Sequence, residues 1–412
     1  MADNKDKKVL NVPALRFPEF TEEWKRCIIG ELTTKVGSGV TPRGGEAVYK
    51  SEGHPFVRSQ NVGLGHLMLD DIAYIDEDTH QRQKNTELQL DDVLLNITGA
   101  SIGRSALVNQ QIVGGNVNQH VCIIRANKKL IPSFLCNFLL SQYGQKQIES
   151  FQAGGNRQGL NFEQIRSIKI GLPSLEEQKK IADLLLLIEQ RITTQSKIIE
   201  KYESLIQAMC DTLIEREMQQ VALSFSDFGQ SYSGLSGKNA EDFGDGYPFI
   251  TYMNVYQNQI IDSTDVGLVK IKETEQQSVV HYGDILFTLS SETPEEVGMG
   301  AVYLGETYPL YLNSFCFGIH ITDEAKIYSP FLAYYVSSQS FRKAVCPLAQ
   351  GSTRFNLQKS DFMKKKFSFP MIEKQRKIYS ILNTYSDKLI VEKQIIGLLC
   401  NQKRYLLRQL FI

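Results

Sequence analysis

An internal repeat constrains the fold of this chain more than any other feature. A segment that begins near Ile131 recurs 197 positions later without a gap, and earlier parts of each half recur at offsets of 192 to 197. The chain is therefore expected to hold two copies of one module, each followed by a long helix, and a duplicated surface suits a duplicated target. The matched residues include Phe134-Leu135 with Phe331-Leu332, Gly154 and Arg157 with Gly351 and Arg354, Glu176 and Gln178 with Glu373 and Gln375, Pro55-Phe56 with Pro248-Phe249, and Asp92-Val93-Leu94 with Asp284-Ile285-Leu286.

Length and charge set the outer limits of this arrangement. At 412 residues with 42% apolar side chains, the chain is too long for one hydrophobic core and can bury two. Its 45 basic and 46 acidic residues give a formal net charge of -1. Binding to a polyanion must therefore come from local patches of the surface, since the net field is close to neutral.

Each module is predicted to be a mixed α/β domain. Short apolar strands such as 93–98 and 121–124 alternate with glycine-rich turns, and a helix is expected after Pro132 with a copy after Pro330. The predicted segments are a polar lead-in at 1–14, a first module at 15–172, a first long helix at 173–216, a second module at 217–369 and a second long helix at 370–412.

Both long helices carry one apolar stripe. Ser174 and Glu177 form a capping box at the start of the first helix, and apolar residues then follow in steps of four and three as in a coiled-coil seam. A stripe of this length must be covered, so we predict that the two helices pair as an antiparallel coiled coil. The alternative is that each stripe docks onto its own module. The predicted pairing residues are Ile181, Leu185, Ile188, Ile192, Gln195 and Ile199 in the first helix and Ile378, Leu382, Leu389, Glu392 and Ile396 in the second, with Gln195 and Glu392 as polar residues that help to fix the register.

Cysteine and hydropathy patterns predict a cytoplasmic protein. The seven cysteines are scattered without a C-x-x-C pair, which favours reduced thiols over disulfides, zinc or redox chemistry. No apolar run approaches the ~20 residues that a membrane helix needs.

Catalytic motifs are missing from the sequence. It has no phosphate-binding loop of the G-x-x-x-x-G-K-[ST] type, no N-P-P-[FY] tetrapeptide and no proline followed by aspartate as in many nucleases. The six histidines lie far apart without H-x-x-x-H spacing, so structural or surface roles are favoured over metal ligation. We therefore expect no enzyme activity and no metal or cofactor bound by this chain.

Polar, glycine-flanked loops are the best candidates for a binding surface. Arginine suits guanine, asparagine suits adenine, and glycine lets backbone amides approach phosphate, so these loops are compatible with DNA. Two alternatives remain open: the repeated arginines are structural ion-pair partners, and the lysine run at 364–366 is a solvated face. The candidate DNA contacts are Arg43, Arg58, Asn61, Arg157, Lys238, Asn254, Arg354 and Lys364.

The layout resembles the specificity subunit of type I restriction-modification enzymes over the range 15–412. The resemblance is carried by Arg16-Phe17-Pro18-Glu19-Phe20, by Leu172-Pro173-Ser174-Leu175-Glu176-Glu177-Gln178 before the first long helix, and by Tyr232-Ser233-Gly234-Leu235-Ser236-Gly237-Lys238 in the second half. It implies two target recognition domains that each read one half-site of double-stranded DNA, with the paired helices setting the spacer between half-sites.

The resemblance also implies the partners. These are two methylation subunits that use S-adenosylmethionine to modify adenine, and restriction subunits that use ATP and magnesium, so the cofactors belong to the partners. Two other readings remain: a stand-alone DNA-binding regulator or scaffold with two modules, and, less favoured for want of a carboxylate cluster, a self-sufficient nuclease.

Overall fold

The computed structural model describes residues 11–42, 44, 48–152, 159–217 and 219–412. The chain divides into two compact units, one formed by 1–196 with 394–412 and the other by 197–393. The division crosses both long helices, so each unit contains one module together with a segment of each helix. Among the described residues, no helix combines the length and apolarity that a bilayer crossing requires.

The first unit is built on a four-stranded antiparallel sheet in the order β2-β8-β5-β6. A second sheet, β4-β3-β7, joins an antiparallel pair to a parallel one, and the pair β1-β9 brings the start of the module to its end. The strands are β1 (Lys25–Ile28), β2 (Thr33–Ser38), β3 (His54–Val57), β4 (Ala73–Ile75), β5 (Val93–Asn96), β6 (Ser105–Leu107), β7 (Asn116–Val117), β8 (Val121–Ala126) and β9 (Lys169–Leu172).

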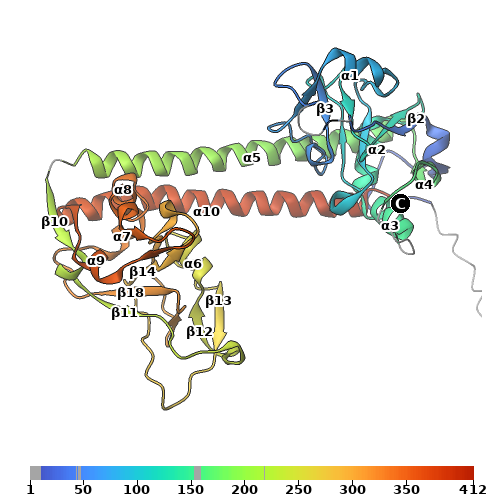
Figure 1. The fold of residues 1–412 in the computed structure, drawn as a ribbon. Coiled ribbons are helices and arrows are strands. Elements are labelled where there is room, and N and C mark those ends of the chain that lie inside the picture. The colour runs from blue at the N-terminus through green and yellow to red at the C-terminus, as the bar shows by residue number, and fades with distance from the viewer. Residues whose placement is uncertain (1–10, 43, 45–47, 153–158, 218) are drawn as a thin grey trace, which may run out of the picture. The chain divides into compact units, whose positions relative to one another are not determined.

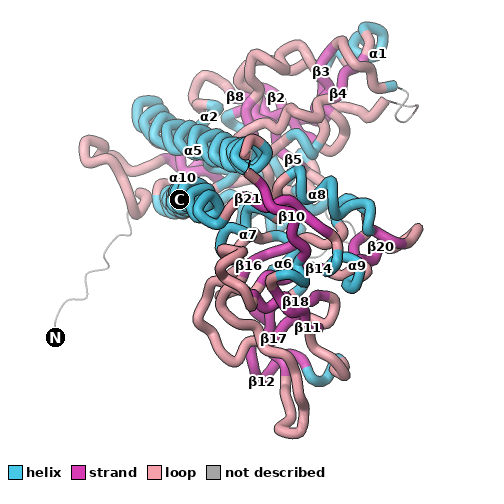
Figure 2. The backbone as a smooth tube through the Cα atoms, turned by 90° about the vertical axis from the view of Figure 1, so that its left-hand side faces the viewer, coloured by secondary structure: helices cyan, strands magenta, loops and turns pink. Residues whose placement is uncertain are grey.

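The second unit repeats this topology strand for strand. Its four-stranded sheet has the order β11-β18-β14-β16, its three-stranded sheet the order β13-β12-β17, and its closing pair is β10-β21, which Figure 2 shows as adjacent strands. A further small sheet, β15-β20-β19, is found in this unit. The strands are β10 (Gln220–Ser224), β11 (Gly229–Ser233), β12 (Phe243–Ile250), β13 (Val266–Val269), β14 (Ile285–Thr288), β15 (Ser290–Ser291), β16 (Gly300–Val302), β17 (Tyr311–Leu312), β18 (Cys316–Ile321), β19 (Ala349–Gln350), β20 (Phe355–Leu357) and β21 (Lys366–Pro370).

Strand registers confirm that the two modules share one backbone plan. In the first, Val57 of β3 pairs in parallel with Val117 of β7, and in the second, Ile250 of β12 pairs in parallel with Leu312 of β17. Parallel pairing of short strands needs a long connection, so its recurrence at the same place is a specific signature of duplication. The mixed α/β fold with two similar modules is therefore as predicted.

Short helices cover one face of each four-stranded sheet. In the first module Phe134, Leu135, Phe138 and Leu139 are fully buried on α2, as the helical spacing predicts. The second module fills the same place with Phe331 and Leu332 together with a cluster of aromatic rings around Phe225. The helices are α1 (Glu77–Arg82), α2 (Pro132–Leu140), α3 (Gln142–Gln152) and α4 (Phe162–Ser167) in the first module and α6 (Tyr252–Gln257), α7 (Ser329–Tyr335), α8 (Gln339–Val345) and α9 (Lys359–Lys364) in the second.

The two long helices are α5 (Leu175–Glu215) and α10 (Ile372–Gln409), of 41 and 38 residues. The hydroxyl of Ser174 accepts a hydrogen bond from the backbone N–H of Glu177, as a capping residue should. The carboxylate of Glu177 does not complete the predicted capping box, however, because Arg16 binds it through two hydrogen bonds of 2.8 and 2.9 Å. A buried ion pair to the start of the chain thus replaces the local cap.

Within each unit, a segment of α5 lies alongside a segment of α10 that runs in the opposite direction (Figure 1). In the second unit, Lys374 pairs at 3.4 Å with Glu217, just past the end of α5, and Lys393 pairs at 2.8 Å with Glu203 of α5. Positions in and just after α5 therefore decrease as those along α10 increase. In the first unit, Lys403 of α10 pairs with Glu189 of α5. The helices are therefore antiparallel in both units, as predicted.

The apolar stripe of α5 packs on the first module as well as against α10. Both predicted ways of covering the stripe therefore occur together. Ile181, Leu185 and Ile188 belong to one buried cluster that contains both Phe134 of α2 and Leu406 of α10. In the second unit, Ile378 and Leu382 of α10 likewise join the core of the module. The helices are thus anchored in their modules at one end of each stripe.

The seam residues are buried to different degrees. Gln195 is buried, while Ile192, Ile199, Leu389, Glu392 and Ile396 are half-buried. Toward the end of α5 the buried positions are Ile206, Cys210 and Ile214, in steps of four. Met209 and Leu213, which continue the steps of four and three along the helix, are only half-buried.

Candidate nucleic-acid interface

A glutamine at the start of each long helix fixes the helix to its module. The Gln178 amide accepts from Ile131 N at 2.8 Å and donates to the carbonyls of Lys129 and Pro173 at 3.1 and 3.0 Å. Gln375 repeats all three bonds, to Tyr328 N at 2.9 Å and to the carbonyls of Lys326 and Pro370 at 3.1 and 2.8 Å. These repeated motif residues are therefore structural, and they hold each module's loops on a rigid base.

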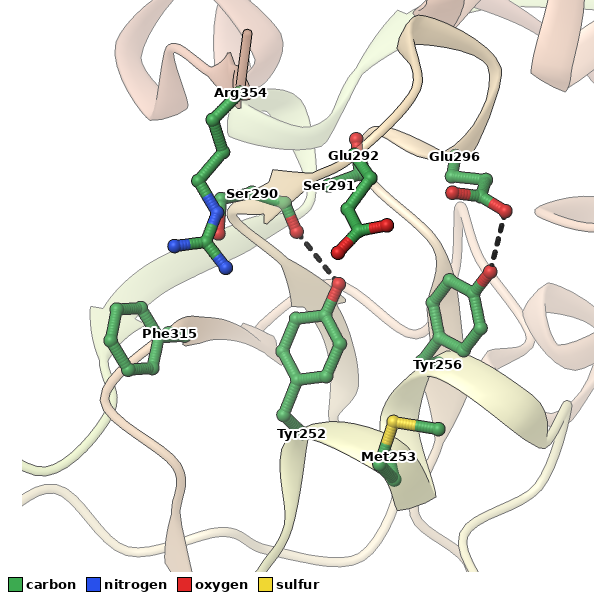
Figure 3. A pocket seen from close by; sticks show the side chains of 9 residues that line it. All are labelled: Tyr252, Met253, Tyr256, Ser290, Ser291, Glu292, Glu296, Phe315 and Arg354. Carbon is green, nitrogen blue, oxygen red and sulfur yellow. Dashed lines mark hydrogen bonds between the residues drawn. The ribbon is translucent and has the colours of Figure 1, made fainter.

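Candidate DNA-contacting loops of the second module meet around one pocket of about 340 Å³. Tyr252 and Tyr256 come from α6, Ser290 and Ser291 from β15, and Arg354 from the turn before β20 (Figure 3). These segments are far apart in the sequence. They come together in the folded module and form one site. Met253, Glu292, Glu296 and Phe315 complete the lining.

The two tyrosines of this pocket are locked in place. The Tyr252 hydroxyl donates to the carbonyl of Ser290 at 2.7 Å, and the Tyr256 hydroxyl donates to the Glu296 carboxylate at 2.7 Å, the two dashed bonds of Figure 3. Their rings are stacked with centroids 5.9 Å apart. Burial raises the pKa of Tyr252, and the hydrogen bond to Glu296 raises that of Tyr256, so both phenols stay protonated at neutral pH. The pocket wall is thus preorganised.

The chemistry of the pocket fits the edge of a base better than a phosphate. Arg354 offers a fork of donors, while Glu292 is exposed on the same wall and offers a carboxylate acceptor (Figure 3). Carboxylates repel phosphate but accept hydrogen bonds from the amino group of cytosine, and arginine donates to guanine. Phe315, which is 58% exposed, adds an apolar face beside them.

The first module presents a related but different surface at the same place. His120 occupies the position that corresponds to Phe315, and its Nδ1 lies 2.6 Å from the Thr98 hydroxyl. Ser59 and Gln60 stand where Tyr252 and Met253 stand in the second module. The counterpart of Arg354 is Arg157, which lies outside the described residues, as does Arg43. Equal backbones with unlike side chains are what two readers of different sequences need.

Two predicted base contacts, Asn61 and Asn254, are instead internal clamps. Asn61 is 1% exposed, and its amide donates to the carbonyls of Met68 and Asp71 at 2.9 and 3.3 Å. Asn254 is 0% exposed and donates in the same way to the carbonyls of Asp262 and Asp265 at 2.8 and 2.6 Å. Each amide closes the loop that follows it, so neither side chain is available to DNA.

Two predicted cationic contacts are also engaged within the protein. Arg58 binds the backbone and carboxylate of Asp71 at 2.8 and 3.1 Å. The side chain of Lys238 is 3% exposed, and its ammonium group donates to the Lys270 carbonyl at 2.6 Å and pairs with Glu275. These two cations stabilise loops as structural ion-pair partners. That is the alternative role predicted for the repeated arginines.

Among the candidate DNA contacts that the structure describes, the exposed cations are Arg354 and Lys364. Lys364 ends α9 and lines a shallow depression with Lys359 and the β11 residue Ser231. Lys359 donates to the Ser233 hydroxyl of β11 at 3.2 Å. None of the described residues that line this basic edge is a carboxylate, so the edge suits the backbone of a nucleic acid better than the pocket does.

Comparison with known proteins gives a consistent match. The family model described as "Type I restriction modification DNA specificity domain" matches residues 21–203 and again 227–399. The "Putative type I restriction enzyme MjaX specificity subunit" of Methanocaldococcus jannaschii is 21% identical over 91% of this chain and 90% of its own length. The EcoKI specificity subunit of Escherichia coli is 22% identical over 68% of this chain and 64% of its own length.

Solved structures share the fold. The S subunit of the type I restriction-modification system of M. genitalium aligns with a TM-score of 0.56 at 16% identity, over 97% of this chain and 99% of its own. A chain from a structure of the assembly and conformational transition of the type I R-M system aligns with a TM-score of 0.58 at 17% identity, over 93% and 96%. At this identity, the likeness concerns the backbone arrangement.

Proposed function

This chain belongs to the type I restriction modification DNA specificity domain family, and from that premise we propose that it is the specificity subunit of a type I restriction-modification complex. In this role it reads a bipartite DNA target, one half-site per module, and catalyses nothing itself. The observation that carries the proposal is the double match of the family model, once per module, on two modules with one backbone plan and different side chains around the reading loops.

The partners follow from this role. Two methylation subunits that use S-adenosylmethionine would modify adenine, and restriction subunits that use ATP and magnesium would cleave. The complex would work in the cytoplasm, where the seven free cysteines of this chain stay reduced. The stand-alone regulator remains the second candidate, and co-purification with a methylation subunit separates the two.

The pocket of the second module is proposed to read bases, and the basic edge at Lys364 to hold the DNA backbone. Arg354→Ala should then cost about 1–3 kcal/mol and relax the preference at one position of one half-site. Lys364→Ala should weaken binding to all sequences alike and lower the salt slope by about one unit.

The deciding experiment maps methylated adenines in DNA from cells with and without this protein. The expected result is a bipartite motif whose methylation depends on this chain. In cells that carry Arg354→Ala, one half of the motif should lose specificity while the other half is unchanged. A motif that persists without this chain, or that is continuous, would contradict the proposal.

A further inference from the structure

A buried carboxylate in the second module is flanked by two imidazoles. Asp284, immediately before β14, is 1% exposed, and its Oδ1 lies 2.5 Å from Nδ1 of His320 on β18. The ring of His281 lies against that of His320, with centroids 4.4 Å apart. One potential ligand atom from each of the three side chains lies within 4.8 Å of the others.

The first module satisfies the same carboxylate in another way. Asp92 occupies the position of Asp284, and Arg125, in the place of His320, binds it through two hydrogen bonds of 2.7 Å each. A permanent cation thus neutralises Asp92. In the second module a histidine, whose charge is not permanent, takes the place of this arginine beside the buried carboxylate.

Two donors orient one oxygen of the Asp284 carboxylate. Its Oδ2 accepts from the Tyr232 hydroxyl at 2.6 Å and from the backbone N–H of His281 at 2.9 Å. Oδ1 lies within hydrogen-bonding distance of Nδ1 of His320. Metal-binding carboxylates are commonly held in place by hydrogen bonds from groups that do not themselves touch the metal. Asp284 has such hydrogen bonds on Oδ2, while its Oδ1 lies beside a histidine nitrogen.

The neighbouring strand β18 leaves room for the Tyr232 ring, which carries one of these donors. The ring lies across Gly318 of β18, where an added Cβ would come within 2.1 Å of the ring. In the first module Gly37 and Ile123 occupy these two positions, so the tyrosine and its glycine gap go together with the histidines.

We propose that His281, Asp284 and His320 form a binding site for one divalent transition-metal ion of the zinc class. Two imidazole nitrogens and one carboxylate oxygen are ligands that zinc commonly takes, with a fourth position left for water. Zinc–nitrogen bonds of about 2.0–2.1 Å place tetrahedral ligands roughly 3.3 Å apart. In the structure the three ligand atoms lie within 4.8 Å of one another. Rotation of the exposed His281 side chain can bring its nitrogen to the tetrahedral spacing, because the hydrogen bond from His281 to Asp284 is made by its backbone N–H.

The ion would take the charge-balancing part that Arg125 plays in the first module. It would join the turn before β14 to β18, and so stabilise the sheet on which the reading loops stand. Histidine spacing along the chain did not indicate this site, because its ligands come from a turn and a strand 36 positions apart and meet only through the pairing of β14 with β18.

Isothermal titration of the chelator-treated full chain with Zn²⁺ tests the proposal, with Co²⁺ as a spectroscopic probe. We expect one equivalent of Zn²⁺ to bind and raise the melting temperature, and Co²⁺ to give the visible absorption of a tetrahedral site. His281→Ala should weaken binding by more than ~100-fold, beyond the 10–100-fold typical of a lost outer partner. This variant keeps the backbone bond to Asp284, so it should fold normally without added metal.

The matched control is His54→Ala in the first module. His54 is also stacked on an imidazole, that of His80, with centroids 3.8 Å apart, and it also contacts a carboxylate, Glu77, at 2.6 Å. Both variants retain all seven cysteines, so binding to thiols affects them equally. Unchanged binding and melting of His281→Ala in Zn²⁺, binding lost in His54→Ala instead, or no stoichiometric binding by the unaltered chain would each overturn the proposal.

Discussion

Several single residues that repeat between the modules have structural duties, while many positions around the candidate reading loops differ. Gln178 and Gln375 make the same three hydrogen bonds, and Asn61 and Asn254 the same loop closure. Around the reading loops the paired positions diverge, as His120 and Phe315 do. Duplication preserves what the backbone requires and leaves the rest free to fit different ligands.

The glutamine clamp leads to a stability prediction. Gln375→Ala removes three hydrogen bonds at a site where Gln375 itself is 0% exposed. The unpaired groups left behind should lower the free energy of unfolding of the second unit by about 2–4 kcal/mol, since each buried orphan costs about 1–3 kcal/mol. Urea denaturation measures this. Lys377→Ala, on the exposed face of the same helix, is the control and should change stability by less than about 0.5 kcal/mol.

Cysteine reactivity gives a second prediction at this scale. Burial raises the pKa of Cys136 to about 11 and that of Cys122, Cys210 and Cys316 to about 12, which leaves almost no thiolate at neutral pH. Cys400 is exposed on α10. A maleimide should therefore modify Cys400 first, and the four buried thiols should react only on unfolding. Mass spectrometry of the native protein measures this, and rapid labelling of Cys210 would show that the seam of α5 is open.

The elements differ in how clearly the local sequence pattern predicts them. The starts of α5 and α10 follow from the prolines at 173 and 370 and from the apolar stripe after them, and α2 follows from its apolar face. The candidate site was harder to predict, because exposure depends on tertiary contacts. Nothing local distinguishes Lys238, which is buried in an ion pair, from Lys364, which is exposed. The pocket around Tyr252 forms only when three distant loops meet.

An ion pair between the long helices leads to a pH prediction for the first unit. Burial alone would raise the pKa of Glu189, but hydrogen bonds from His66 and Lys403 outweigh it and lower the pKa below 4.5. The charged form is thus favoured by folding, and its contribution is present above pH ~4.5 and is lost as the pH falls through the folded pKa. Glu189→Gln should cost about 1–3 kcal/mol at pH 7, and progressively less as the pH falls below ~4.5 and through the folded pKa.

Glu203→Gln is the matched control for this experiment. Glu203 also pairs with a lysine of α10, at 2.8 Å, but its side chain is 49% exposed and that of Lys393 is 54% exposed. An exposed pair contributes only about 0–1 kcal/mol, so this variant should be nearly neutral. Chemical denaturation between pH 3 and 8 compares the two. A pH-independent loss in Glu189→Gln would assign the effect to packing instead of charge.

At the scale of the whole molecule, the proposed function makes the paired helices a spacing device. Two readers on one scaffold bind together only when the half-sites match their separation and rotational phase. Each added base pair moves a half-site by ~3.4 Å and rotates it around the duplex. Spacer length should therefore matter as much as half-site sequence.

The boundary between the two compact units offers a way to test the spacing device. It crosses α5 after Ser196 and α10 after Lys393, so seven residues inserted at both points keep the helix pairing inside each unit. Such a double insertion lengthens both helices by ~10 Å while nearly preserving the phase of the seam. Motif mapping should find an altered spacer between unchanged half-sites, or specific binding should be lost.

A four-residue insertion near Gln195 in α5 alone is the contrasting variant. It adds about one turn to one helix of the pair and should change the preferred spacer or abolish binding. Single-module binding distinguishes the outcomes, because oligonucleotides that carry one half-site should still bind weakly to either variant if the modules remain folded. An unchanged spacer preference in both variants would mean that something other than these helices sets the distance between half-sites, and the bipartite mechanism proposed for this chain would fail.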